Sequence, residues 1–290
     1  MASYPSYRVA AWLSRRLPAR MAYWVGLRIA DLYFAFSSNS RRAVHHNLAQ
    51  VLRWRGVEPA RYALAGLTRK TFQYYGKYLV DFFRCTQLTA EGMRDAVSLE
   101  HPERLASAHG AGRGVIIATA HLGNWEMGAA VLKAMGYSLT AVVAPARLPR
   151  LEQLLRRQRE ERGMHVVPVG HSARHLLRAL KRGELVGLLA DRDFSHEQQS
   201  VELFGKTVHM PRGPAWLALH SGAPILPAFL LRQEDDTFLF RLHEPIVPKP
   251  GDDVTSLSLR LRDVLQEAIG ACPHQWFIFH DFWAPEPVST

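Results

Sequence analysis

The sequence has few cysteines and no long uninterrupted apolar run. Its two cysteines, Cys85 and Cys272, form neither a disulfide framework nor the paired spacing of a zinc site, which favours a reducing compartment. Residues 1–6 are not the positively charged start of a secretory signal, and no continuous apolar segment follows them. We therefore expect neither secretion nor stabilisation by disulfides.

Several common catalytic motifs are lacking as well. The glycine-rich stretch 110–114 precedes a strand and contains neither GxGxxG nor a Walker lysine, so we interpret it as a turn. Residues 170–174 resemble a nucleophile elbow, but Arg174 stands where its second glycine is required, which argues against a serine hydrolase. The 14 histidines match no standard zinc spacing, and we expect no catalytic metal and no cofactor.

Acidic residues are scarce in the first 80 residues, and this scarcity accounts for the whole positive charge. That segment contains 13 Lys and Arg but 2 Asp and Glu, whereas the remainder contains 23 basic and 24 acidic residues. The net charge of +10 is therefore N-terminal. A basic surface confined to one segment attracts anionic lipid headgroups or nucleic acid.

Arginine and aromatic residues are interspersed through residues 7–37. The best apolar stretch, residues 21–36, is interrupted by Arg28 and Asp31 and is short for a bilayer span, which needs about 20 apolar residues. This composition is typical of a helix in a membrane interface, although a helix packed on the domain with snorkelling arginines would look similar. We favour the interfacial helix. Further helices are predicted at 41–54 and 62–84, so residues 1–85 form a basic amphipathic helical segment.

From Val97 onward, strands and helices alternate, which predicts a parallel sheet with crossover helices. Strands are expected near residues 97–99, 114–120, 138–143, 165–168, 185–190, 224–231 and 237–243. Helices are expected near residues 102–109, 124–135, 149–162, 172–182, 213–221 and 255–270. The segment with Phe204-Gly205 and Met210–Pro214 is predicted as a loop. The fold class is therefore α/β: a single domain, residues 86–290, with a mostly parallel central sheet flanked by helices, joined to the N-terminal membrane-associating segment.

The stretch from Gly114 to Glu126 carries the candidate chemistry. Residues 114–120 are small or apolar and predict a buried strand, His121 follows its carboxyl end, and Asn124 is placed to cap the next helix. Glu126 lies in the first turn of that helix, where the helix dipole favours a carboxylate. It is predicted to accept the Nδ1 proton of His121, so that Nε2 acts as a base toward an alcohol. The alternative is a histidine that only caps the helix.

Charged and aromatic groups elsewhere extend the candidate site. Asp191, Arg192 and Asp193 follow the apolar strand 185–190, at the sheet edge where ligands bind in α/β proteins. The helix 149–162 carries a run of arginines; most are expected on a solvated face, but one could stabilise an oxyanion or bind a phosphate. The aromatic segment 275–283 is either core or the wall of a lipid-facing groove.

An ordered set of motifs resembles one family. His121-Leu-Gly-Asn-Trp-Glu126 resembles the H-x4-D/E motif of the bacterial lipid A biosynthesis (late) acyltransferases, which include the phosphatidylinositol mannoside acyltransferases. Further segments follow in the family's order: Leu189–Asp193, Phe204-Gly205, Met210–Pro214, Gly222–Pro227 and Pro273–Trp276. Ser40–Arg42 with Asn47 resembles its N-terminal segment, so the resemblance spans roughly residues 38–283.

The resemblance implies a glycerolipid-acyltransferase-like fold and transfer of a fatty acyl group from acyl carrier protein or coenzyme A to a glycolipid hydroxyl. It implies His121 as general base and Glu126 as its charge-relay partner. Arg159 matches an arginine of the family's Arg-Glu-x-x-Gly-Met segment and is the candidate for an anion or thioester contact. Asp191, Arg192 and Asp193 would line the same cleft; this triplet is more similar to the mannoside branch than to the Asp-Gln-Asp of the lipid A branch, and the acceptor is open.

Together these features predict a membrane-associated acyltransferase that works by single displacement, without a serine or cysteine nucleophile. Backbone amides near Asn124, with help from Arg159, are expected to hold the oxyanion. The basic segment would hold the enzyme on the anionic cytoplasmic face of the bacterial inner membrane. Two alternatives use the same features: a nucleic-acid-binding protein, for which no recognisable motif is present, and a thioesterase with water as the acceptor.

Overall fold

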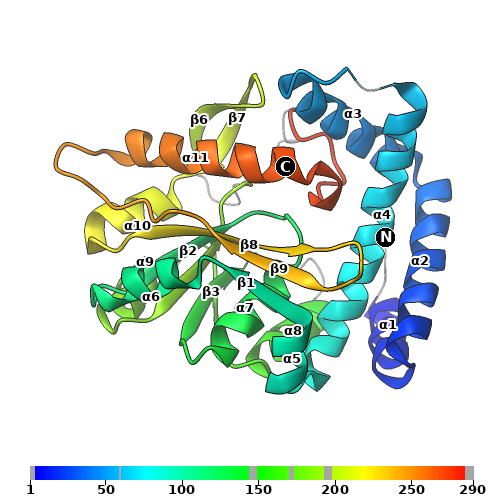
Figure 1. Ribbon diagram of the computed structural model, residues 1–290, viewed down its shortest axis with the longest axis horizontal. Coiled ribbons are helices and arrows are strands. Elements are labelled where there is room, and N and C mark those ends of the chain that lie inside the picture. The colour runs from blue at the N-terminus through cyan, green and yellow to red at the C-terminus, as the bar shows by residue number, and fades with distance from the viewer. Residues whose placement is uncertain (1–3, 59, 144–148, 170–172, 193–197, 285–290) are drawn as a thin grey trace.

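The computed structural model describes residues 4–58, 60–143, 149–169, 173–192 and 198–284 (Figure 1). Its helices are α1 (Tyr4–Arg16), α2 (Ala19–Phe36), α3 (Ser38–Trp54), α4 (Arg61–Arg84), η1 (Cys85–Gln87), α5 (Ala90–Ala96), α6 (Pro102–Gly110), α7 (Trp125–Ala134), α8 (Pro149–Glu160), α9 (Ala173–Lys181), α10 (Gly213–Ser221), α11 (Val254–Ala271) and η2 (Pro273–Gln275). Its strands are β1 (Val97–Glu100), β2 (Val115–Thr119), β3 (Leu139–Val143), β4 (Met164–Pro168), β5 (Leu185–Leu189), β6 (Gln198–Leu203), β7 (Lys206–Pro211), β8 (Ile225–Arg232) and β9 (Phe238–Leu242).

A seven-stranded sheet organises the chain, in the order β1-β9-β8-β2-β5-β3-β4. Strands β8, β2, β5, β3 and β4 run parallel to one another, whereas β9 is antiparallel to β8 and parallel to β1. The predicted α/β class and mostly parallel sheet are confirmed, as are the seven predicted strands and the helices between them.

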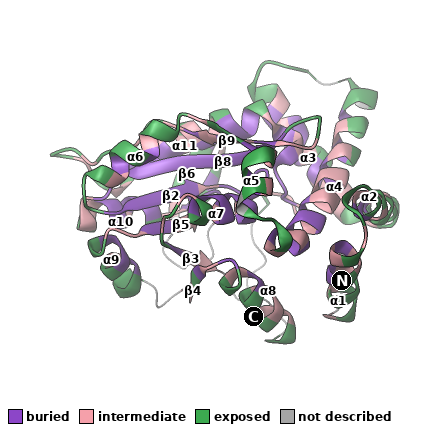
Figure 2. Ribbon diagram, turned by 60° about the horizontal axis from the view of Figure 1, so that its bottom comes forward, coloured by how far each residue is buried: buried purple, intermediate pink, exposed green. Residues whose placement is uncertain are grey.

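The sheet is covered on both faces, so its central strands are almost wholly buried (Figure 2). Successive residues of β2 enter opposite layers: Ile116 packs in the cluster with α9, α10 and α11, and Ile117 in the cluster with α6 and α7. This two-sided burial explains why β2 and β8 are nearly continuous apolar runs.

The loop predicted for Phe204-Gly205 and Met210–Pro214 is wrong in part, because Phe204-Gly205 joins the two strands of the antiparallel hairpin β6–β7, and Met210 and Pro211 belong to β7. Phe204 and Gly205 form the turn of the hairpin and both have positive φ, 55° and 75°. The strands bury alternate residues, Val201 and Leu203 on one and Val208 and Met210 on the other. That two-residue period marks a half-buried strand and was present in the sequence.

Helices α1 to α4 stand together at one side of the sheet, with α4 between α2 and the α/β part (Figure 1). The inner face of α2 is made of small residues, Ala22, Gly26 and Ala30. They let α2 approach α4 so closely that a Cβ on Gly76 would lie 2.8 Å from the carbonyl oxygen of Gly26. Several large apolar side chains of α2 are exposed on its other side, among them Trp24, Ile29 and Phe36. A boundary at residue 85 stays a prediction.

Candidate active site

The site forms where two neighbouring parallel strands end. Strands β2 and β5 pair in the register Thr119↔Leu189, and the amide of Ala190 donates to the carbonyl of Thr119 at 2.7 Å. His121 and Asp191 each follow the end of their strand by two residues. The sheet register thus sets these two side chains opposite each other at its carboxyl edge, where open α/β sheets bind ligands.

Asp191 holds His121 through both of its carboxylate oxygens. Its Oδ1 lies 3.0 Å from Nδ1 of His121, and its Oδ2 accepts from the His121 amide at 3.0 Å and from Nε1 of Trp276 at 2.9 Å. Asp191 is fully buried. Burial alone would raise its pKa, but His121 and the Trp276 indole outweigh that effect and hold the pKa of Asp191 below its usual value.

The predicted contact between His121 and Glu126 is therefore corrected to a contact between His121 and Asp191. Glu126 is turned toward α8, where its Oε1 accepts from Nε and Nη2 of Arg159 at 2.9 and 2.7 Å. Arg162 adds an ion pair, with Nη1 3.6 Å from Oε2. The carboxylate of Glu126 is almost wholly buried by these partners. It links α8 to the start of α7 through these two arginines.

The predicted cap of α7 is confirmed, because Oδ1 of Asn124 accepts from the amide of Met127 at 3.0 Å. The turn before it requires glycine at position 123: its φ is +65°, and a Cβ there would lie 2.1 Å from the carbonyl oxygen of Leu230. Nδ2 of Asn124 donates to Asp81 at 3.2 Å. Both ends of the Asn124 carboxamide are thus engaged in positioning the start of α7.

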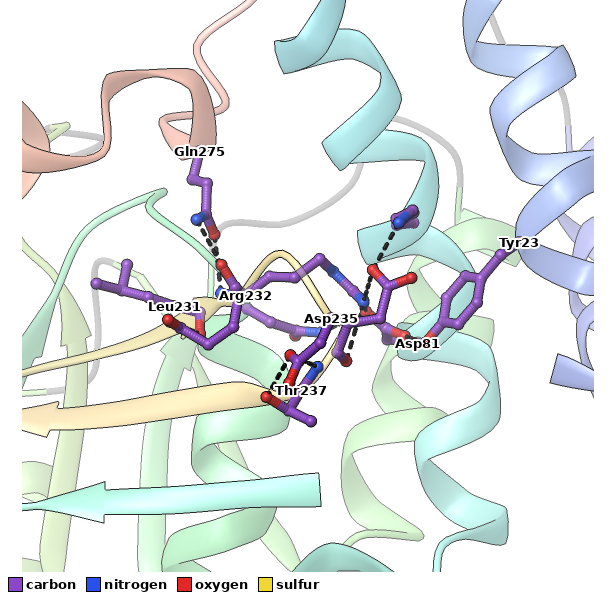
Figure 3. A network of polar contacts seen from close by, with 11 residues as sticks. Tyr23, Asp81, Leu231, Arg232, Asp235, Thr237 and Gln275 are labelled. Atoms are coloured by element: carbon purple, nitrogen blue, oxygen red, sulfur yellow. Dashed lines mark hydrogen bonds and ion pairs between the residues drawn. The ribbon is translucent and has the colours of Figure 1, made fainter. Parts of the chain in front are cut away.

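Asp81 is the centre of a buried polar network that links α2, α4, α7 and β8 (Figure 3). Its carboxylate accepts from the Tyr23 hydroxyl at 2.6 Å and pairs with the guanidinium of Arg232. Burial alone would lower the pKa of Arg232, but Asp81 and Tyr23 outweigh it and raise that pKa. Arg232 also pairs with Asp236 at 2.9 Å. The network anchors α4 beside the segment that carries His121.

The remaining predicted site residues fall in different places. Arg159 lies beside the site but donates to Glu126, so its direct contact with an anion stays a prediction. Arg192 is half-buried next to Asp191. Asp193 lies outside the described residues, as do residues 170–172 of the discarded elbow motif.

The aromatic segment near the C-terminus is core around the site. Trp276, Phe277 and Ile278 are buried, and the amide of Phe277 donates to the carbonyl of His121 at 2.7 Å. Asn47 of α3 holds the same segment by donating to the carbonyls of Ile278 and His280. The sequence predicts Trp276 only as core or as part of a groove wall, and its hydrogen bond to Asp191 was not predicted; the available signal was its place in the matched segment Pro273–Trp276.

The arrangement is that of a base oriented by a buried carboxylate. With Asp191 accepting at Nδ1, the basic nitrogen of neutral His121 is Nε2. The ring packs edge-on against Trp125 at 5.2 Å, and the side chain is 18 % exposed. The dyad can take a proton from a hydroxyl group and stabilise the imidazolium that forms. In the described part of the chain, no group of three or more His, Cys, Asp and Glu could hold a metal ion.

The sequence profile of the bacterial lipid A biosynthesis acyltransferases matches residues 5–284. The chain belongs to this family. It is 30% identical to a phosphatidylinositol mannoside acyltransferase of Mycolicibacterium smegmatis, over 94% of this chain and 89% of that protein. It is also 30% identical to one from Mycobacterium tuberculosis, over 94% and 86%. The lipid A biosynthesis palmitoleoyltransferase of Escherichia coli is 22% identical, over 96% and 90%. The protein is thus an acyltransferase, and the His-Asp dyad lies on a segment that the family profile covers.

Proposed function

We propose that this acyltransferase moves a fatty acyl chain from a thioester, carried by acyl carrier protein or coenzyme A, to a hydroxyl group of a membrane glycolipid. The observation that carries the proposal is the His121–Asp191 dyad at the carboxyl edge of the sheet. The family membership and the names of the relatives support a glycolipid acceptor of the lipid A or phosphatidylinositol mannoside type.

In the proposed reaction, Nε2 of His121 takes the proton of the acceptor hydroxyl while the hydroxyl oxygen attacks the carbonyl carbon of the thioester. The tetrahedral intermediate then collapses: the C–S bond breaks, and the leaving thiolate takes the proton back from the imidazolium. Asp191 keeps the ring in the required tautomer and stabilises its positive charge. The products are an ester and a thiol, and no acyl-enzyme is formed.

The first turn of α7 is the proposed oxyanion site. The amides of Trp125 and Glu126 are first-turn donors, which an α-helix leaves without helical acceptors, and the positive end of the helix dipole favours an anion there. Gly123 and the Asn124 cap fix this turn next to His121. We propose that Glu126 and Arg159 act by holding the same turn in place.

The test of the function is a transfer assay with purified protein. Octanoyl and palmitoyl thioesters of acyl carrier protein and of coenzyme A are supplied with a lipid A precursor or a phosphatidylinositol mannoside, and the lipids are analysed by mass spectrometry. We expect one acceptor to gain the mass of a single acyl chain in a protein-dependent way. Release of free fatty acid at the same rate with and without acceptor would instead indicate a thioesterase.

We further propose that α1 and α2 lie on an anionic membrane surface. Large apolar side chains point outward from these helices, among them Trp24 and Phe36, which are 63% and 85% exposed. Figure 2 shows the outer side of α2 as exposed. Basic side chains flank this apolar face, including Arg20 and Arg28. A helix with an apolar face and flanking arginines is typical of interfacial binding. No helix in the described residues has both the length and the apolar character needed to cross a bilayer.

Substituting Trp24→Ser and Phe36→Ser together is expected to weaken binding to vesicles of phosphatidylglycerol and phosphatidylcholine by at least about tenfold. The reason is that the substitutions remove the two large apolar side chains that would enter the hydrocarbon part of the membrane. Binding of the unsubstituted protein should also weaken as salt is raised. Vesicle co-sedimentation measures both effects. The matched control is Leu99→Ser with Val247→Ser, two exposed apolar residues of the α/β part. Equal loss in both double variants would refute the assignment to α2.

A further inference from the structure

A groove of about 600 Å³ lies between α1, η1 and α8, away from the His121–Asp191 dyad. Its lining consists of Arg8, Ala11, Trp12, Arg15, Arg16, Gln87 and Leu154. The volume is in the range of small-molecule sites. None of these residues takes part in the proposed transfer reaction, so the proposed reaction does not account for the groove.

The lining separates into a cationic part and an apolar part. Arg8, Arg15 and Arg16 contribute three guanidinium groups, and no acidic residue is among the lining residues. Trp12, Ala11 and Leu154 contribute hydrocarbon and an aromatic face, and Trp12 is 60% exposed. A ligand that matches both parts has an anionic head joined to a hydrocarbon group.

Arg15 is the cation of the groove whose position is fixed by contacts with the rest of the protein. Its Nε donates to the carbonyl of Phe83 at 3.1 Å, which fixes the guanidinium in place. Its Nη2 is buried and has no hydrogen-bond acceptor among the described residues; Glu161 is 3.7 Å away, beyond hydrogen-bond distance. The guanidinium is thus anchored at the wall of the groove, and its partly exposed side chain leaves room for a phosphate to add a second, charge-assisted partner.

We propose that this groove binds the phosphate ester of an amphiphile, with the phosphate on the three arginines and the hydrocarbon on Trp12 and Leu154. Three cationic groups favour a phosphate monoester over a fatty acid carboxylate, because the monoester has three terminal oxygens and up to two negative charges whereas a carboxylate has two oxygens and one charge. The ligand has two sources, a phospholipid of the membrane surface or the coenzyme A form of an acyl donor. The site is independent of the dyad, so it stands or falls separately from the proposed reaction.

The experiment measures binding by isothermal titration calorimetry with octyl phosphate as the probe. Arg8→Gln with Arg16→Gln is the test variant, because both side chains are exposed and their loss leaves the Arg15 anchor intact. We expect this variant to bind octyl phosphate at least about tenfold more weakly than the unsubstituted protein. Arg53→Gln with Arg94→Gln removes the same charge from exposed positions outside both the groove and the α2 face, and should bind as the unsubstituted protein does. His121→Ala should also bind normally.

Two further probes distinguish the sources. Dihexanoyl phosphatidic acid below its micelle concentration represents the phospholipid, and S-octyl coenzyme A represents the donor. The probe whose binding depends on Arg8 and Arg16 identifies the ligand class. Absence of octyl phosphate binding, or equal binding by the test variant and its control, overturns the proposal. Octanoate binding as tightly as octyl phosphate overturns the assignment to phosphate.

Discussion

His121→Ala is expected to lower the rate constant of acyl transfer by about 10²–10⁴, because it removes the proposed general base. The variant should keep the fold, since the histidine side chain is at the surface of the site and partly exposed. Transfer is followed by mass spectrometry of the lipid product, and the fold by circular dichroism. A variant that turns over at the rate of the unsubstituted enzyme would exclude His121 as the base.

Asp191→Asn and Glu126→Gln form a matched pair, because each removes one buried carboxylate charge near the same helix turn. Asn at position 191 cannot stabilise the imidazolium, so we expect its transfer rate to approach that of His121→Ala. Glu126→Gln keeps the dyad and weakens the hold on Arg159, so we expect a smaller loss. The opposite ranking would restore Glu126 as the relay and contradict the dyad.

Asp191 also predicts a pH effect on stability. Its pKa lies below its usual value in the fold, so its ionised form stabilises the native state above the ordinary aspartate pKa of about 4. That contribution is lost as the pH falls through the lower folded pKa. In Asp191→Asn, urea unfolding should therefore change less between neutral and acid pH than in the unsubstituted protein.

Arg232→Met is expected to lower the free energy of unfolding by about 3–5 kcal/mol, because it leaves the carboxylate of Asp81 buried without its cation. The contacts of Asp81 with Tyr23 (Figure 3) and with Asn124 remain, but neither partner carries a positive charge. Urea unfolding followed by circular dichroism measures the change.

The control is Arg241→Met, whose partner Glu100 forms a pair in which both side chains are 35% exposed. Solvent screens that pair, so its loss should cost about 1 kcal/mol or less. Adding Asp81→Leu to Arg232→Met should recover part of the lost stability, because it removes the unpaired charge. Equal effects of Arg232→Met and Arg241→Met would show that burial of the network does not matter.

The local patterns in the sequence predicted the elements well, because each depends on residues close in the chain. The apolar run before His121, the cap at Asn124 and the apolar strand before Asp191 all fold as expected. The hairpin β6–β7 was not predicted, although Val201 and Leu203 on one strand and Val208 and Met210 on the other alternate with more exposed residues; each strand has only six residues, so the alternation is a weak signal.

The partner of His121 could not be predicted in the same way. Choosing between Glu126 and Asp191 requires knowing that β5 lies next to β2, and β3 and β4 intervene in the sequence. Glu126 was nearer in the chain, but α7 turns it toward the arginines of α8. The available signal was that His121 and Asp191 each directly follow the end of a predicted strand. Once the strand order places β2 next to β5, this equal placement puts the two side chains opposite each other.

The close backbone approach at Gly26 and Gly76 packs α2 directly against α4. Trp24 and Phe36 are consequently displayed by a helix that is already folded and anchored. Because the helix is folded before it meets a lipid layer, binding would not have to include the entropy cost of forming it. The binding free energy would be more favourable by that amount. Residence on such a layer would then depend on side-chain insertion and charge, and the orientation of the sheet edge relative to the lipid would be set before contact.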